Sequence, residues 1–214
     1  MSQITHHIPE PMLVAYAAGR LEHPFALVVA AHVSLCDECR ARLGAHEAVG
    51  GAVLESQSLQ PVSAGMKESI LARLDDVAQP EPQEQTFERS GAYPGPVMTA
   101  LKGKPPRWKS VGKGVRQSIL HADDEGSVRL LYIPPGQAVP DHGHHGIELT
   151  LVLQGAFRDE TGRFAVGDLE VADDTLEHAP VAEMGAPCIC LAATDAPLNF
   201  KGMIPRLLQP FFRI

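Results

Sequence analysis

The chain has 214 residues, a formal net charge of −8, 44% hydrophobic residues and four cysteines. This length allows one large domain or two small ones, with ample material for a buried core. The acidic balance argues against direct nucleic-acid binding, which needs a basic surface, and is compatible with docking onto a basic protein. Four cysteines are too few for a disulfide scaffold, so we expect a cytoplasmic protein whose cysteine pairs bind metal or do redox work.

No targeting segment is visible in the sequence. Residues 1–7 lack a basic region followed by an apolar core, so we expect no secretory signal. The longest apolar stretch, around residues 26–33, contains His32 and is far shorter than the roughly 20 residues that cross a bilayer. We therefore expect no membrane contact.

The N-terminal part is rich in Ala, Leu and Val and predicts four short helices. Glu10-Pro11 suits the start of the first helix and Gly19 its C-cap. Asp37 is a plausible N-cap for the third helix, which Gly50-Gly51 either break or only weaken. The expected helices cover residues 10–19, 24–35, 37 to at least 49, and 66–77. Because short helices cannot each bury a face alone, they should bundle or dock on a partner.

A change of composition near residue 80 predicts a domain boundary. Residues 79–85 are rich in Pro, Gln and Glu, and the Gly- and Pro-containing segment 91–96 extends the irregular region. We therefore predict a helical domain over residues 1–78, a linker over 79–97 and a second domain over 98–214. Since the linker has little apolar material, we expect no fixed interface between the two halves.

The C-terminal part contains short β-like runs separated by Gly, Pro and Asp. This pattern favours an all-β sandwich or jelly roll. The fold class that follows is α+β in two domains, a short-helix bundle and then a β barrel. The clearest runs are residues 129–133, 147–153, 168–171 and 189–191.

The first candidate site is a His–Cys–Cys triplet in the helical part. His32 and Cys36 lie one helical turn apart, and Cys36-x2-Cys39 adds a second thiol, giving three ligands within eight residues. A structural zinc ion takes four N or S ligands in a tetrahedron, so a fourth must come from elsewhere. The alternatives are a redox pair or two unrelated buried cysteines. The nearest candidates for the fourth ligand are His6 and His7, followed by His23 and His46.

This triplet after an N-terminal histidine resembles the zinc-binding anti-sigma domain. The resemblance covers residues 1 to about 78 and implies a four-helix module that sequesters a sigma factor of the extracytoplasmic-function type. It implies that the sigma factor is occluded from RNA polymerase. The ligand set that it implies is His7, His32, Cys36 and Cys39. We choose His7 because it is nearer the first helix, and His6 stays open.

The second candidate site lies in the β part. Residues 136–155 fit the pattern G-x5-H-x-H-x3-E-x6-G, with His142, His144 and Glu148, and resemble the first cupin motif. On an extended chain these three residues have the same parity and point to one face, whereas His145 points away. Imidazoles and a carboxylate that converge inside a barrel suit zinc, iron or manganese.

The second cupin motif is only partial. Gly167-Asp168 opens a strand and His178 follows, but the family's Pro-x-Gly and Asn are missing. The resemblance implies His142, His144, Glu148 and His178 as metal ligands. The alternative is a set of surface histidines near a turn. A cupin fold hosts dioxygenases, isomerases and sensors, so the fold alone does not decide the function.

Cys188 and Cys190 form a third feature, in a late strand-like run. Two residues apart on a strand, their thiols share a face, and a disulfide between them would be strained. They are small core residues, extra metal ligands or targets of oxidation.

The order of the two sites along the chain is similar to that of the ChrR-like anti-sigma factors. Further similar segments are residues 139–144, 151–160, 188–195 and 209–214. The resemblance implies a negative regulator of transcription and not an enzyme. Its helical domain would bind the sigma factor, and its cupin domain would sense a reactive oxygen signal of the singlet-oxygen kind. The alternatives are a dioxygenase-like cupin metalloenzyme with a helical adaptor, and a zinc-dependent adaptor for another protein.

Overall fold

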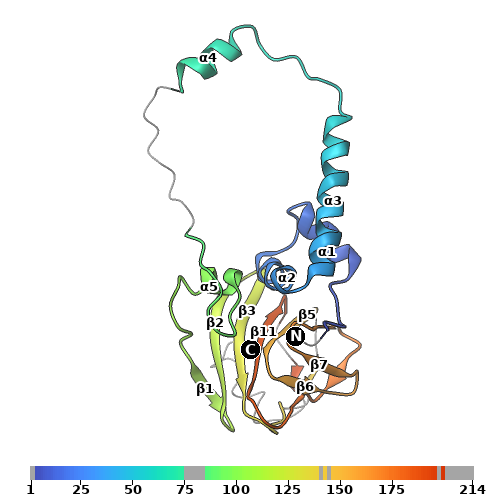
Figure 1. Cartoon of the computed structure of the whole chain (residues 1–214), viewed down its shortest axis with the longest axis vertical. Helices are drawn as coiled ribbons and strands as arrows, with labels where there is room; N and C mark the ends of the chain where they lie inside the picture. The colour runs from blue at the N-terminus through green and yellow to red at the C-terminus, as the bar shows by residue number, and fades with distance from the viewer. Residues whose placement is uncertain (1–2, 75–84, 140–141, 144–145, 197–198, 201–214) are drawn as a thin grey trace.

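The computed structural model describes residues 3–74, 85–139, 142–143, 146–196 and 199–200, without the side chains of 142–143 and 199–200. Helices come first along the chain and strands follow (Figure 1). The helices are α1 Glu10–Ala17, α2 His23–Leu35, α3 Asp37–Glu55, α4 Met66–Ala72 and α5 Gly95–Ala100. The strands are β1 Lys109–Gly112, β2 Val115–Asp123, β3 Gly126–Ile133, β4 His142–Gly143, β5 Glu148–Gln154, β6 Ala156–Arg158, β7 Arg163–Ala165, β8 Leu169–Ala172, β9 Glu177–His178, β10 Val181–Ala182, β11 Cys188–Thr194 and β12 Asn199–Phe200.

The four predicted helices are present as α1 to α4. Helix α3 continues through Gly50-Gly51 to Glu55, because a glycine inside a helix costs only about 1 kcal/mol and a long helix absorbs it. Its N-cap is Cys36 and not Asp37. The predicted end of the fourth helix, at residue 77, lies outside the described residues. Helix α5 begins at Gly95, inside the segment that we expected to be irregular, with Pro96 in its first turn.

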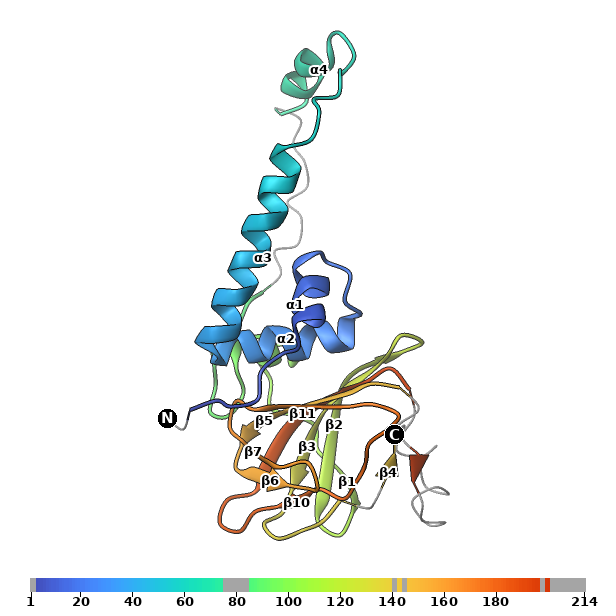
Figure 2. The same cartoon turned by 90° about the vertical axis from the view of Figure 1, so that its right-hand side faces the viewer.

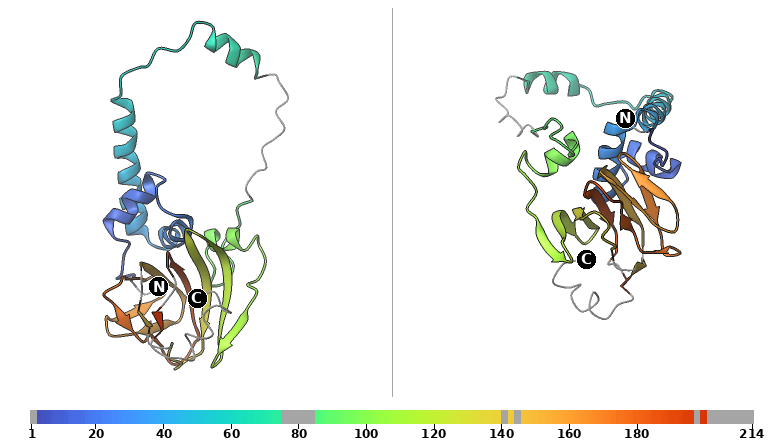
Figure 3. Two further views of the ribbon diagram at one scale, coloured as in Figure 1. Left: turned by 180° about the vertical axis from the view of Figure 1, so that it is seen from behind. Right: turned by 60° about the horizontal axis from the view of Figure 1, so that its bottom comes forward.

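The C-terminal part is antiparallel β structure, which confirms the predicted fold class. One sheet has the strand order β1-β2-β3-β11-β5-β8, and two smaller sheets have the orders β10-β6-β7 and β12-β4-β9. Figure 3 shows the strands gathered at the end of the molecule opposite the projecting helices. The four predicted strands correspond to β3, β5, β8 and β11, whereas β1 and β2 and the short strands were not predicted.

The central strands β5 and β11 of the large sheet are buried on both faces, and successive residues of β5 alternate between them. Leu149, Leu151 and Leu153 belong to the core shared with the helices, whereas Val152 belongs to a second core inside the barrel. Glu148 and Thr150 have the same parity as Val152, so they face the barrel interior. Burial on both faces explains why the sequence of this strand is an almost unbroken apolar run.

Helix α2 lies across the outer face of the large sheet and joins the two halves of the molecule (Figure 2). It packs on β11, β3 and β5, and Phe25, Val28 and Val29 share one core cluster with Leu149 and Leu191. Our expectation that no fixed interface joins the halves is therefore wrong. The apolar face of α2 makes this interface, so the composition of the linker does not determine whether the two halves are in contact.

The outer half of α3 and all of α4 project away from the rest of the molecule (Figures 1 and 2). None of the seven residues of α4 is buried. The large apolar side chains exposed on this arm are Val49, Val53, Leu54, Leu59, Val62, Met66, Ile70, Leu71 and Leu74. Among the described residues, no helix is both long and apolar enough to cross a membrane.

Candidate metal centres

The corner between α2 and α3 gathers three side chains of the first site. Helix α2 ends at Leu35, and Cys36 adopts an extended backbone with φ −110° and ψ 108°. Its Sγ accepts a hydrogen bond from the backbone N–H of Cys39 at 3.5 Å, so the same residue caps α3. His32 lies one turn earlier on α2, which turns its ring toward the same corner.

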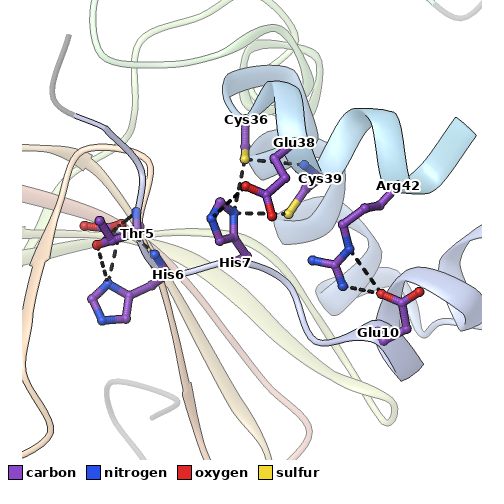
Figure 4. A network of polar contacts seen from close by, with 9 residues as sticks. Thr5, His6, His7, Glu10, Cys36, Glu38, Cys39 and Arg42 are labelled. Carbon is purple, nitrogen blue, oxygen red and sulfur yellow. Dashed lines mark hydrogen bonds and ion pairs between the residues drawn. The ribbon is translucent and has the colours of Figure 1, made fainter.

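His7 completes the cluster from an extended segment before α1. Its Nδ1 lies 3.4 Å from Sγ of Cys36 and 3.6 Å from Sγ of Cys39 (Figure 4). One ligand atom from each of His7, His32, Cys36 and Cys39 lies within 4.8 Å of all the others. Bonds of about 2.0–2.3 Å in a zinc tetrahedron place N and S ligands roughly 3.5 Å apart. The donor set and its spacing therefore fit a zinc ion.

The burial of His32 supports the same conclusion. Its side chain is 0% exposed, and neither ring nitrogen makes a hydrogen bond of ordinary length and angle, although the backbone of Gly167 lies close enough to raise its pKa. Buried polar atoms without partners are rare and need an explanation, which a metal bond supplies. Burial lowers the pKa of His32 to about 4, so the ring is neutral near pH 7, as metal binding requires. Burial also raises the pKa of the Cys39 thiol, and a bound cation would reverse that effect.

The geometry separates His7 from the other candidate histidines. The Nδ1 of His6 lies 3.5 Å from Oδ1 of Asp168 in the cupin domain, away from the thiols. His23 packs on His121 with ring centroids 4.7 Å apart, and His46 pairs with Glu10. The free edge of His7 is also held, because its Nε2 lies 3.4 Å from Oε2 of Glu38. A carboxylate on the second nitrogen orients a ligating imidazole.

The predicted cupin site is only partly within the described residues. Glu148 and His178 are buried, 9% and 2% exposed. His142 is the register partner of His178 across β4 and β9. The described residues do not include His144 or His145, and for His142 they include only the backbone. Glu148 and His178 provide a carboxylate and an imidazole, which suit a divalent metal.

Two carboxylates that the sequence analysis missed surround His178. Its Nδ1 lies 2.8 Å from Oδ2 of Asp159 and 3.2 Å from Oε1 of Glu170, and all three side chains are almost fully buried. Burial raises the pKa of Glu170 to about 7. For His178, burial acts to lower the pKa, but the bonds to Glu170 and Asp159 outweigh it and raise the pKa to about 9. The sequence does contain a signal for Glu170, because it is a charged residue within the otherwise apolar strand β8.

Cys188 and Cys190 share the inner face of β11, as predicted. Their Sγ atoms are 3.5 Å apart, both residues are buried, and both belong to the core inside the barrel. Arg129 is a further buried group, 5% exposed, which donates to Oε1 of Gln117 at 3.1 Å and to Oγ of Ser127 at 2.6 Å. The interior of the barrel therefore has an apolar part, around Cys188 and Cys190, and a strongly polar part, around Arg129.

A helical His/His/Cys/Cys cluster beside a cupin-like sheet defines the class of the molecule. It has N-terminal helices that carry a candidate metal site and a C-terminal cupin-like fold. The family model described as "ChrR Cupin-like domain" matches residues 99–196. The anti-sigma-E factor ChrR of Cereibacter sphaeroides is 55% identical over 212 residues, 99% of both chains. The chain belongs to the ChrR family of anti-sigma factors.

A solved structure agrees with this assignment. The crystal structure of Rhodobacter sphaeroides SigE in complex with the anti-sigma ChrR contains a chain that is 53% identical to this one. It matches with a TM-score of 0.78 and covers 90% of this chain and 100% of that chain.

Proposed function

We propose that this protein is an anti-sigma factor that sequesters a cytoplasmic sigma factor of the extracytoplasmic-function type. The observation that carries the proposal is the 55% identity to ChrR over 99% of both chains. The crystal structure of the similar chain in complex with SigE supports a sigma factor as the partner. A regulator of this kind binds and releases a protein, and needs no catalytic residue.

The projecting arm of α3 and α4 is the surface that we assign to the sigma factor. Leu54 is 74% exposed, Ile70 57% and Leu74 70%, and exposed apolar patches of this kind mark protein-binding sites. The residues up to 79 carry five basic and nine acidic side chains, a formal net charge of −4. A phosphate backbone would repel this charge and a basic protein surface would attract it, which supports a protein partner over DNA.

Co-purification with the sigma factor tests this assignment. The double variant Leu54→Asp with Ile70→Asp should weaken binding at least tenfold, because it places two charges in the apolar contact. Met184→Asp is a matched control, since Met184 is 82% exposed but lies on the cupin domain. Equal affinity of the arm variant and the control would contradict the proposal, as would salt-sensitive binding of the isolated protein to promoter DNA.

The helical cluster is proposed to hold zinc through His7, His32, Cys36 and Cys39. Zinc would supply folding energy to a small domain by joining two segments, the extended chain at His7 and the α2–α3 corner at residues 32–39. The cupin site is proposed to hold zinc, iron or manganese through His142, His144, Glu148 and His178. What supports the second site is the burial of Glu148 and His178, the electrostatic effect of Glu148 on His178, and the register of His142 with His178.

The cupin domain is proposed to sense a reactive oxygen species, such as singlet oxygen, and to relieve inhibition. Two features support this: the paired thiols of Cys188 and Cys190, which are oxidisable, and the imidazoles of the proposed metal site. Glu148→Ala should leave sigma binding intact and blunt the response to singlet oxygen in cells. A normal response of this variant would contradict a sensing role for the cupin metal. A dioxygenase-like enzyme would instead turn over a substrate when loaded with metal.

A further inference from the structure

Residues 4–8, which we call the N-terminal strap, run from the cupin domain to the cluster of the helical domain. Asp168 of the cupin domain holds this strap by its backbone. Its Oδ1 accepts hydrogen bonds from the backbone N–H of Thr5 at 2.7 Å and of His6 at 3.0 Å. The backbone N–H of Leu169 donates to the carbonyl of His6 at 3.2 Å. The strap is therefore tied to the start of β8 immediately before His7.

The contact is buried and closely packed. The Asp168 side chain is 4% exposed, and its Oδ2 accepts the N–H of Ala165, so one carboxylate joins the β7–β8 turn to the strap. A Cβ added at Gly167 would meet Cδ1 of Ile4 at 2.5 Å. The ring of His6 packs against that of Phe164 at a tilt of 42°, with centroids 4.4 Å apart. Side chains on both sides of the bonded backbone thus hold the strap in one place.

His7 differs from the other members of the cluster in how it is held. His32, Cys36 and Cys39 are fixed by α2 and α3, whereas His7 lies on extended chain outside any helix or strand. The strap anchors its backbone on one side, and the buried Ile8, 1% exposed, anchors it on the other. Charge-assisted hydrogen bonds to a buried carboxylate are the strongest of these anchors. Loss of Asp168 should therefore free His7 more than any of the other three ligands.

We propose that Asp168, in the cupin domain, is a positioning residue for His7 in the metal site of the helical domain. Strand β8 then connects the two candidate sites, because Glu170, two residues after Asp168, contacts His178 inside the barrel. A change at His178 would reach the helical site through residues 168–170, where Asp168 directly precedes β8 and Glu170 lies within it. The proposal rests on the proposed function in one respect, that the helical cluster holds zinc.

The first test measures release of zinc from the full-length protein to a chromophoric chelator. Asp168→Ala should speed release from the helical site about tenfold, and Asp168→Asn, which keeps an acceptor oxygen, should lie between it and the parent. Thr5→Pro removes one of the two backbone N–H donors to Oδ1 of Asp168 and leaves the β7–β8 turn intact, so it should also speed release. Asp124→Ala, on an exposed turn, is the matched control.

Cobalt substitution separates positioning from a general loss of stability. The thiolate-to-cobalt absorption band reports only a site that contains cysteine ligands. In Asp168→Ala this band should persist, while the bands sensitive to coordination geometry change as they do in His7→Ala. Release rates within twofold of the parent in both Asp168→Ala and Thr5→Pro, with fast release in His7→Ala, would overturn the positioning role alone. A parent protein without zinc in this site would overturn the proposed metal site as well.

The link through β8 is tested with Glu170→Gln. This change should alter zinc release from the helical site at least threefold when Asp168 is present, and should have no effect in the Asp168→Ala background. Effects of equal size in the two backgrounds, or none in either, would overturn the link through β8 and leave Asp168 as a local anchor.

Discussion

The Sγ of Cys36 lies 3.4 Å from Nδ1 of His7, 29 residues away in the sequence, and the same sulfur caps helix α3. One side chain thus ends α2, begins α3 and faces the fourth member of the cluster. The local fold of the helical domain and its candidate metal site therefore depend on the same residue.

Replacement of the clustered cysteines should remove zinc and sigma binding together. Cys36→Ser keeps an N-cap that can accept a hydrogen bond, so loss of zinc from this variant would not reflect loss of the cap. We expect zinc affinity to fall at least 100-fold in Cys36→Ser and Cys39→Ser, because thiolate ligands supply most of it. Metal analysis and co-purification measure the two effects, and Cys188→Ser is the control. Full zinc occupancy in both variants would show that the site is misassigned.

Removal of the carboxylates beside His178 should weaken the cupin metal. Glu170→Gln and Asp159→Asn change the groups that hold Nδ1 of His178, and loss of such outer partners costs about 10- to 100-fold in metal affinity. Glu177→Gln alters the exposed neighbour of His178 and should have no effect. Competition with a chelator measures the affinity. If the two buried variants bind metal as tightly as Glu177→Gln, the carboxylates do not support a ligand.

The two adjacent histidines of the first cupin motif should behave differently. His144→Ala should lose the cupin metal, whereas His145→Ala should retain it, because alternate residues of an extended chain point to opposite faces. Both residues lie outside the described part of the chain, so this stays a prediction from the sequence. Metal content of the two purified variants checks it, and equal loss in both would mean that the register is wrong.

The shared core should make the helical domain depend on the cupin domain for stability. Phe25 is 3% exposed in the core that α2 forms with the large sheet, so Phe25→Ala should cost about 3–5 kcal/mol. Val53→Ala, at a site 56% exposed on α3, should cost little. Chemical denaturation of the full chain measures both. A loss below 1 kcal/mol for Phe25→Ala would contradict the interface.

The isolated fragment of residues 1–85 should bind the sigma factor and fail to release it under oxidative stress. It keeps the arm and the helical cluster but lacks the proposed sensor, and it exposes the apolar face of α2, so it should unfold more readily than the full chain. Induction assays in cells and thermal unfolding of the fragment check the two parts. Normal induction by the fragment would point to the helical thiolates as the switch.

The local pattern of residues determined much of this protein. Three kinds of signal act over only a few residues and can therefore be read from the sequence alone. They are the helix starts at Pro11 and Pro24, the His32–Cys36–Cys39 spacing, and the short apolar runs of β3, β5, β8 and β11. They were enough to predict helices α1 to α4, the β domain and three members of the helical cluster, but not α5. The resemblance that they carried added the family.

Only the tertiary structure decided which side chains and elements from distant parts of the sequence lie close together. It placed His7 rather than His6 beside the thiols, brought Asp159 and Glu170 onto His178, and seated α2 on the sheet across the linker. It also placed Asp168 under the N-terminal strap, more than 160 residues away in the sequence. Contacts at such separations arise from the closing of the β barrel and the burial of apolar faces, and no local pattern encodes them.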